Sequence, residues 1–300
     1  MRNPLPCITL CLATCCLGAG CASPFSSGGQ SSLASFEQRQ VFRPARYPDG
    51  NWSPAGYKFE DAWFHAEDGT RLNGWYYPHE NPVGVVLLAH GNSANMTAYA
   101  DALHVLHDRH RLSVMVFDYR GYGKSDGEPD EPGILEDARA ARQWLARRAN
   151  IPEHDIILMG HSLGGGVVVD LAAAEGARGL ILVNTFTSLP DVASYHLPLV
   201  PARRLMRNRL DSLSKIENYH GPLLQGHCET DHSIPFTQGK RLFAKANEPK
   251  RFVATTGIGH DDLLPDDFQK SLDEFLASLP ATTPLPKPAR WHATGSQTSL

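Results

Sequence analysis

The sequence predicts an α/β fold with a mostly parallel central sheet and helices on both faces of that sheet. Short apolar runs without polar alternation recur along the chain, which is typical of strands buried on both faces. Segments with apolar residues at helical spacing separate these runs, and strands that alternate with helices form parallel sheets. The chain has 300 residues, 42% hydrophobic and 20% charged, which is enough for one large domain with its own core.

The elements follow in order along the chain. Asp68-Gly69 lies between the aromatic-rich segments 62–65 and 72–77, and this arrangement favours a β-hairpin. Later apolar runs predict strands over 83–89, 112–117, 156–159, 180–183, 222–224 and 251–254. Amphipathic or small apolar segments predict helices over 134–149, 164–174, 238–246 and 268–279.

The first 20 residues are typical of an export signal. Arg2 precedes the apolar run 5–17, which is too short to cross a bilayer as a helix, and small residues then lead to Cys21. The segment resembles a bacterial lipobox, so we expect Cys21 to be lipidated and residues 21–40 to form a tether to a membrane of the cell envelope. The alternative is an ordinary cleaved signal and a secreted or periplasmic protein.

The remaining chain divides into a domain over 41–279 and a tail over 280–300, which is rich in Pro, Thr and Ser and is expected to be disordered. The net charge of -4 shows no basic excess, so we expect no nucleic-acid partner. Of the six cysteines, only Cys228 lies in the domain, which excludes a disulfide framework. No metal-ligand spacing stands out, and we expect neither a metal nor a cofactor.

Gly160-His161-Ser162-Leu163-Gly164 fits the pattern of a nucleophilic serine on a tight turn. The motif follows an apolar strand and opens a Gly/Ala/Val-rich helix, which is the setting that this turn requires. The glycines at both ends allow backbone segments to approach closely. We expect Ser162 to be the nucleophile and the backbone N–H of Leu163 to be one donor of an oxyanion hole.

A serine hydroxyl is a weak nucleophile at neutral pH and needs a base. His260 follows the last predicted strand, precedes the last helix and is preceded by Gly259, so we expect it to be that base. Asp231 lies between Ser162 and His260 in the chain and follows the penultimate strand, so we expect it to orient the imidazole. Glu229 and Asp191 are the competing carboxylates.

Asn92 follows the strand that begins at residue 83, where the second oxyanion N–H is expected. Two nearby polar residues, His90 and Asp118, are expected to be structural.

These segments resemble the α/β-hydrolase superfamily over about residues 41–279. The similarity is greatest to its small-lid branch, the bud-emergence-type or serine-aminopeptidase-like hydrolases, which includes monoglyceride-lipase-like enzymes. It implies an α/β-hydrolase fold with a short lid, here about 185–221, and a Ser-Asp-His triad without a cofactor. One position departs from the branch, because Cys228 stands where Gly is usual. The matching motifs are Glu60–Phe64, Asp68-Gly69, Gly74-Trp75, His90–Asn92, Tyr119–Ser125, Gly160–Gly165, Asp231-x-x-Ile234-Pro235 and Gly259-His260.

The lid segment combines an apolar run, Leu197–Pro201, with four arginines at 203, 204, 207 and 209. A basic, apolar segment of this kind is suited to lipid headgroups or an anionic substrate. We therefore expect a serine hydrolase that cleaves ester or thioester bonds of small acyl or lipid-like substrates at a membrane surface. The alternatives are a serine peptidase on the same scaffold and a non-catalytic lipoprotein that binds a ligand.

Overall fold

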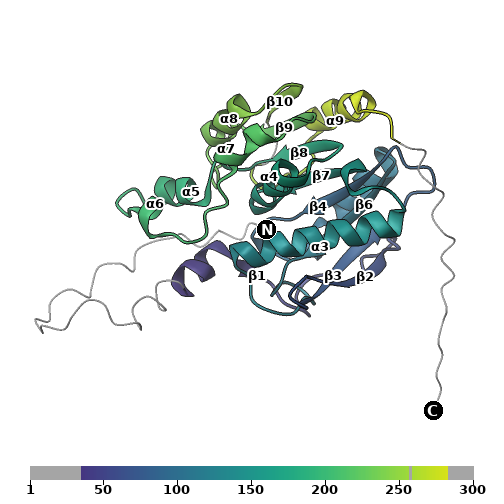
Figure 1. Ribbon diagram of the computed structural model, residues 1–300, viewed down its shortest axis with the longest axis horizontal. Coiled ribbons are helices and arrows are strands. Elements are labelled where there is room, and N and C mark those ends of the chain that lie inside the picture. Colours follow the sequence, from purple (N-terminus) through teal and green to yellow (C-terminus); the bar gives the residue numbers. More distant parts are fainter. Residues whose placement is uncertain (1–34, 257–258, 283–300) are drawn as a thin grey trace, which may run out of the picture.

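The computed structural model describes residues 35–256 and 259–282, and within them eight strands form one sheet in the order β10-β9-β8-β7-β4-β6-β3-β2 (Figure 1). β3 runs antiparallel to both of its neighbours, and the other pairings are parallel. The strands are β2 (Glu60–His65), β3 (Arg71–Tyr77), β4 (Gly84–Ala89), β6 (Leu112–Asp118), β7 (Ile156–His161), β8 (Gly179–Val183), β9 (Leu223–Cys228) and β10 (Lys250–Thr255). The predicted α/β fold with a mostly parallel sheet is confirmed.

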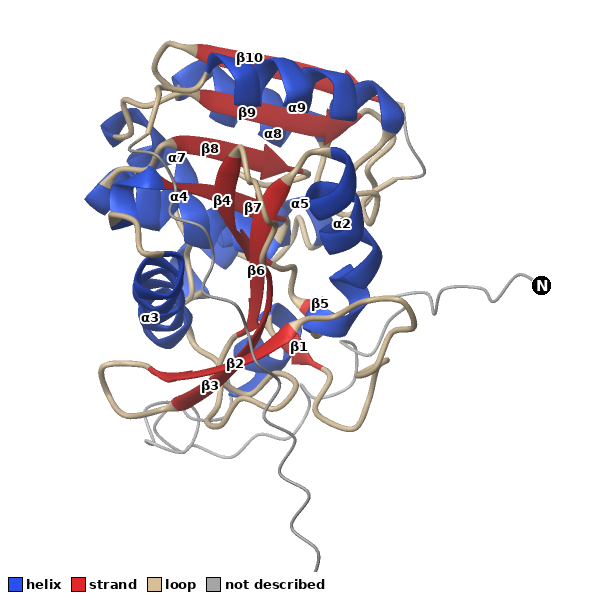
Figure 2. Cartoon of the chain, turned by 90° about the vertical axis from the view of Figure 1, so that its right-hand side faces the viewer, coloured by secondary structure: helices blue, strands red, loops and turns tan. Residues whose placement is uncertain are grey.

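The β2–β3 hairpin forms one edge of the sheet because its turn residues suit a tight reversal. Gly69 has φ +86°, which an L-residue rarely adopts, and its N–H donates to the carbonyl of Ala66. The Asp68 carboxylate accepts the N–H of Thr70 at 2.9 Å. Figure 2 shows the sheet twisting between this hairpin at one edge and β9 and β10 at the other.

Alternate residues of the central strand β4 divide the core into two layers, because side chains along a strand point to opposite faces. Leu87 packs with residues of α3 (Glu131–Ala149) and α4 (Leu163–Glu175). Leu88 packs on the opposite face with residues of α9 (Asp266–Ser278). Both faces of the sheet are therefore covered, which explains why its strands are apolar without alternation.

Shorter elements complete the fold. A helix over residues 35–41 opens the described part. β1 (Arg43–Pro44) pairs with β5 (Ser93–Ala94) in a small parallel sheet beside the loop after β4. The others are η1 (Met96–Tyr99), α2 (Ala100–His104), the π-helix η2 (Val105–Arg109), η3 (Glu153–Asp155) and α8 (Phe236–Lys245).

The segment between β8 and β9, where the lid is expected, contains four short helical elements. In Figure 1 α5 and α6 project from the body on the same side as the helix over residues 35–41. Within the described residues, no helix is long and apolar enough to cross a membrane. The elements are α5 (Leu189–His196), α6 (Ala202–Leu205), α7 (Ser212–Lys215) and η4 (Ile216–Asn218).

Candidate active site

Five loops meet at one edge of the sheet, because parallel strands all present their carboxyl ends there. Asn92 follows β4, Ser162 follows β7 and Asn184 follows β8. Asp231 follows β9 and His260 follows β10. Residues that are far apart in the chain are thereby brought to one place.

Ser162 lies on a strained turn between β7 and α4, with φ 53° and ψ -118°. A methyl group on Gly160 would lie 2.4 Å from the carbonyl oxygen of Gly164, and one on Gly164 would lie 2.0 Å from that of Ala89. Real side chains do not make such contacts, so both positions require glycine. The turn holds the Ser162 hydroxyl at the amino end of α4, where the partial positive charge of the helix is located.

Ser162, His260 and Asp231 form a row of hydrogen bonds. Ser162 Oγ lies 2.9 Å from His260 Nε2, and His260 Nδ1 lies 2.7 Å from Asp231 Oδ2. Because a carboxylate only accepts, Nδ1 carries the proton and Nε2 is left to accept the hydroxyl proton of the serine. This is the arrangement in which an imidazole acts as a general base toward a hydroxyl.

Asp231 is buried and is fixed by its own loop. Its Oδ1 accepts the backbone N–H groups of Ser233 at 2.8 Å and Ile234 at 2.9 Å. Burial opposes ionisation, but the hydrogen bonds from His260 and from these N–H groups outweigh it, so the pKa of Asp231 lies below its ordinary value. The carboxylate is therefore ionised at neutral pH and favours an imidazolium beside it.

The competing carboxylates have other surroundings. Asp191 accepts the hydroxyl of Thr187 and pairs with Arg203 at 2.7 Å. Glu229 is exposed, and its backbone N–H donates to the carbonyl of Thr255.

Cys228, which stands where the related hydrolases usually have Gly, is buried at the end of β9, and its N–H donates to the Asn184 side chain at 2.8 Å. With cysteine at this position, the turn that follows still places the Asp231 carboxylate 2.7 Å from His260 Nδ1.

The loop after β4 passes beside the serine, since a methyl group on Gly91 would lie 3.5 Å from Ser162 Cβ. Asn92 is half-buried in this loop, and Leu163 is the first residue of α4. The first N–H groups of a helix have no partner within the helix, so that of Leu163 is available to a ligand. Both residues are placed where they could surround an oxygen beside Ser162.

Two tyrosines hold this loop from below, a role that the sequence did not reveal. Tyr119 donates its hydroxyl to the carbonyl of His90, and Tyr122 donates to the carbonyl of Asn92, each at 2.9 Å. The backbone N–H of Arg43 in β1 also donates to Asn92, at 3.0 Å. The loop that carries Asn92 is thus fixed through its carbonyl oxygens.

His90 and Asp118 are buried and contact each other, with His90 Nε2 3.4 Å from Asp118 Oδ1. Asp118 also accepts the backbone N–H of Met96 at 2.7 Å. Both residues therefore support the loops beneath the site. Among the described residues, no group of three or more His, Cys, Asp or Glu side chains is placed to hold a metal ion.

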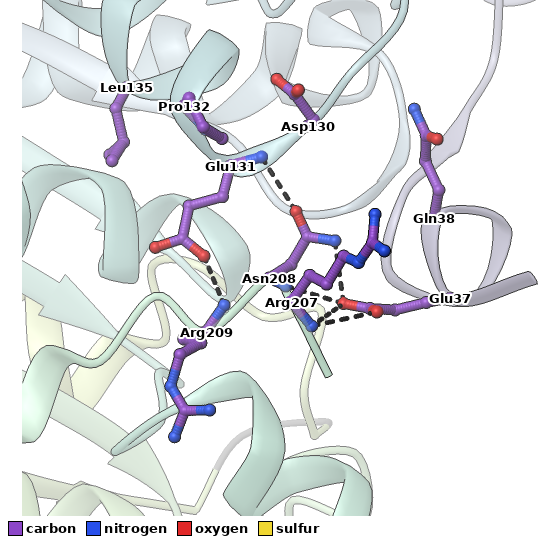
Figure 3. Close-up of a pocket in the computed structure, with 9 residues that line it drawn as sticks. All are labelled: Glu37, Gln38, Asp130, Glu131, Pro132, Leu135, Arg207, Asn208 and Arg209. Atoms are coloured by element: carbon purple, nitrogen blue, oxygen red, sulfur yellow. Dashed lines mark hydrogen bonds between the residues drawn. The ribbon is translucent and has the colours of Figure 1, made fainter. Parts of the chain in front are cut away.

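A separate hollow of about 630 Å³ lies between the helix over residues 35–41, the start of α3 and the lid (Figure 3). Its walls include Glu37, Glu131 and Asn208, which are joined by hydrogen bonds. The triad residues are not among those that line it. We refer to residues 207–209, which Glu37 and Glu131 hold, as the lid clasp.

The lid exposes both apolar and basic side chains. Leu199 is 97% exposed and Leu205 is 59% exposed, and Tyr195 and Leu197 are exposed as well. The arginines at 203, 204, 207 and 209 are all exposed. The lipidation predicted at Cys21 and the signal predicted over 1–20 lie outside the described residues.

Comparisons with known proteins bear on the family and the fold of this chain. A family model described as "Serine aminopeptidase, S33" matches residues 80–216. The uncharacterized protein MT2364 of Mycobacterium tuberculosis is 37% identical over 265 residues, which are 87% of this chain and 93% of that protein. YfhR of Escherichia coli K12, also uncharacterized, is 34% identical over 249 residues, 77% of this chain and 86% of that protein.

Among solved structures, the Pyrococcus furiosus esterase Pf2001 superposes with a TM-score of 0.65 at 20% identity. The match covers 80% of this chain and 98% of the esterase. At 20% identity this likeness shows a shared fold alone.

Proposed function

Since this chain belongs to the α/β-hydrolase superfamily, in its serine-aminopeptidase-like branch, we propose that it is a serine hydrolase that cleaves carboxylic ester or thioester bonds through an acyl-enzyme. The observation that carries the proposal is the row from Ser162 through His260 to Asp231, with separations of 2.9 and 2.7 Å. The family and the esterase folds of its structural neighbours support hydrolase activity.

In the first half of the reaction, Ser162 Oγ attacks the carbonyl carbon of the substrate while His260 Nε2 takes the hydroxyl proton. The carbonyl oxygen becomes an oxyanion that accepts the N–H groups of Asn92 and Leu163. Losing one such donor costs about 3 kcal/mol in the transition state. His260 then gives the proton to the departing alkoxide or thiolate, and the acyl group stays on Ser162.

In the second half, His260 takes a proton from water, and the resulting hydroxide attacks the acyl carbon. The bond to Ser162 Oγ breaks, the serine regains its proton from His260, and a carboxylic acid leaves. Asp231, ionised and buried, stabilises the imidazolium in both halves. The scheme requires no metal and no cofactor.

Labelling of the full-length protein by a fluorophosphonate probe, beside Ser162→Ala, tests the proposal. Labelling that disappears in the variant supports an activated Ser162. Hydrolysis of p-nitrophenyl esters of increasing acyl length, a thioester and an aminoacyl p-nitroanilide then separates the substrate classes. Preference for the anilide would favour the peptidase alternative. A folded protein that the probe does not label would favour a non-catalytic binding protein.

We further propose that the enzyme acts on lipid-like acyl substrates at an anionic membrane surface. The lid supports this, because Leu199 and Leu205 are exposed beside exposed arginines such as Arg204. Apolar side chains that enter the headgroup region and cations that meet anionic lipids act together in such binding. The lipid anchor expected at Cys21 would keep the enzyme near that surface.

Sedimentation with vesicles tests this surface, in a Cys21→Ala background so that an anchor does not dominate. We expect binding to phosphatidylglycerol vesicles to exceed binding to phosphatidylcholine vesicles, and to weaken in Leu199→Ser/Leu205→Ser and in Arg204→Glu/Arg207→Glu. Val83→Ser is the matched control, because Val83 is exposed outside the lid. Equal binding by all variants would exclude the lid as the membrane contact.

Export and lipidation are tested separately by fractionating cells that produce the wild type or Cys21→Ala. We expect the wild type in the membrane fraction and the variant in the soluble exported fraction. A variant that stays bound to the membrane would exclude anchoring through Cys21.

A further inference from the structure

His161, the residue before the nucleophile, has a buried ring with both nitrogens in hydrogen bonds. Nε2 lies 2.8 Å from the main-chain oxygen of His260, and Nδ1 lies 2.8 Å from the Tyr99 hydroxyl. A carbonyl oxygen only accepts, so Nε2 carries the proton and Nδ1 accepts from Tyr99. Burial, reinforced by the neighbouring His260, lowers the pKa of His161 to about 4, so the ring is neutral at physiological pH.

Tyr99 extends this row to the loop after β4. Its hydroxyl oxygen accepts the backbone N–H of Gly91 at 2.8 Å. Gly91 directly precedes Asn92, to which we assign an oxyanion N–H. Three hydrogen bonds therefore connect the loop that carries the oxyanion donor with the loop that carries the base.

The carbonyl of His260 accepts a second buried donor. Asn184, at the end of β8, donates from Nδ2 to this oxygen at 2.9 Å. Its Oδ1 accepts the N–H of Cys228 at the end of β9, on the strand that leads to Asp231. The main chain of His260 is thus held by His161 at the end of β7 and by Asn184 after the neighbouring strand β8.

Gly259, the residue before His260, explains why such support is needed. Gly259 has φ +118°, and a methyl group placed on it would have no neighbour within 4 Å. A glycine in open space leaves its backbone free to adopt many conformations. Without a fixed carbonyl, the imidazole of His260 would lose its alignment with Ser162, and a misplacement of about 1 Å costs on the order of 100-fold in rate.

We propose that His161 is a positioning residue for the proposed ester hydrolysis, which holds the main chain of His260 in place and couples it, through Tyr99, to the loop that carries Asn92. This inference rests on the proposed function. His161 acts through the position of His260 and does not touch the substrate.

Two replacements separate the two hydrogen bonds of the ring. His161→Gln extends an amide N–H to about the place of Nε2 and keeps the bond to His260. His161→Asn ends near Nδ1 and keeps an acceptor for Tyr99. We expect His161→Asn to lower kcat on the order of 10- to 100-fold with little change in KM, and His161→Gln to stay close to the wild type.

A merely structural role would give a different order of activities. Both replacements remove one buried hydrogen bond, so activities that follow the loss of Tm, rather than the bond retained, would overturn the inference. His161→Asn with wild-type kcat would overturn it as well. Fluorophosphonate labelling of the wild type tests the proposed function independently of any role of His161.

A measurement that needs no turnover separates the positioning role of His161 from the proposed function. The chemical shift of the His260 Nδ1 proton, read by NMR at one fixed pH, depends on the hydrogen bond that this proton makes to Asp231. We expect this resonance to move in His161→Asn and to remain in His161→Gln. An identical resonance in both variants and the wild type would overturn the positioning role, whatever the probe labels.

Discussion

Glu37 and Asn208 are 171 positions apart in the chain and are joined by two hydrogen bonds. Glu37 Oε1 accepts the backbone N–H of Asn208 at 2.7 Å and its side-chain amide at 2.9 Å (Figure 3). The same carboxylate accepts the N–H of Arg207 at 2.9 Å. The Asn208 amide oxygen in turn accepts the N–H of Glu131 at the start of α3. The lid clasp is therefore fastened at once to the first described helix and to the body.

Glu37→Ala should loosen the lid clasp. Several N–H groups lose a charged acceptor, and each such bond contributes about 1.5–3 kcal/mol. We expect trypsin to cleave after Arg207 and Arg209 faster by on the order of tenfold, because cleavage follows the population of the open segment. Timed digestion read by mass spectrometry measures this. Glu67→Ala, an exposed glutamate in the β2–β3 turn, is the control, and equal rates in both variants would exclude the clasp.

Asp231→Asn should abolish most of the activity while leaving the loop intact. The amide oxygen can still accept from Ser233 and Ile234, but the amide would no longer favour an imidazolium or the required tautomer of His260. We expect kcat to fall on the order of 10⁴-fold. Asp191→Asn should retain nearly full activity, because that carboxylate pairs with Arg203 in the lid. Ester hydrolysis by the two variants measures this, and a larger loss in Asp191→Asn would reverse the assignment.

The free energy of unfolding should fall between about pH 6.5 and pH 4, partly through His161. Its pKa is about 4 in the folded protein and about 6.5 in the unfolded chain, so only the unfolded state binds the proton in this range. The contribution is fully present above about pH 6.5 and is lost as pH falls, by on the order of 3 kcal/mol. Burial lowers the pKa of His227 too, which acts in the same direction.

Urea unfolding of the wild type and of His161→Gln, at about pH 7 and about pH 4.5, isolates this contribution. Protonation of carboxylates such as Asp231 also destabilises the folded protein in acid, but this loss is common to both proteins. We expect the acid loss to be smaller in the variant by on the order of 1–3 kcal/mol. The same loss in both proteins would show that the ring of His161 does not titrate between the two states.

Features that depend on local pattern could be predicted from the sequence. The buried strands are apolar because both faces are covered, and the turn around Ser162 needs two glycines. The order of Ser162, Asp231 and His260 along parallel strands led to three side chains that the structure brings into contact. Helix α3 begins at Glu131, three residues before the predicted start. The signal was present, because Asp130 caps the N–H of Gly133 and Pro132 suits a first turn.

Features that depend on long-range contacts could not be predicted. β1 and β5 have two residues each, too few for any pattern. Residues 96–109 form three short helical elements without a sustained helical period. The bonds from Tyr119 and Tyr122 to the carbonyls after β4 depend on how two distant turns meet, and so does the bond between Glu37 and Asn208. Sequence alone specifies the groups, while the fold decides which of them meet.

The hydrogen bonds from His161 and Asn184 to the carbonyl of His260 involve its main chain, so a change of the side chain at position 260 does not remove them. In His260→Ala the loop should stay where it is and leave an imidazole-sized vacancy between Ser162 and Asp231. Free imidazole added to this variant should then restore part of the Ser162-dependent esterase activity. In His260→Ala combined with His161→Asn, where of these two residues only Asn184 still holds the carbonyl, it should restore on the order of 10- to 100-fold less. The protein would thus be a scaffold whose base can be supplied from solution.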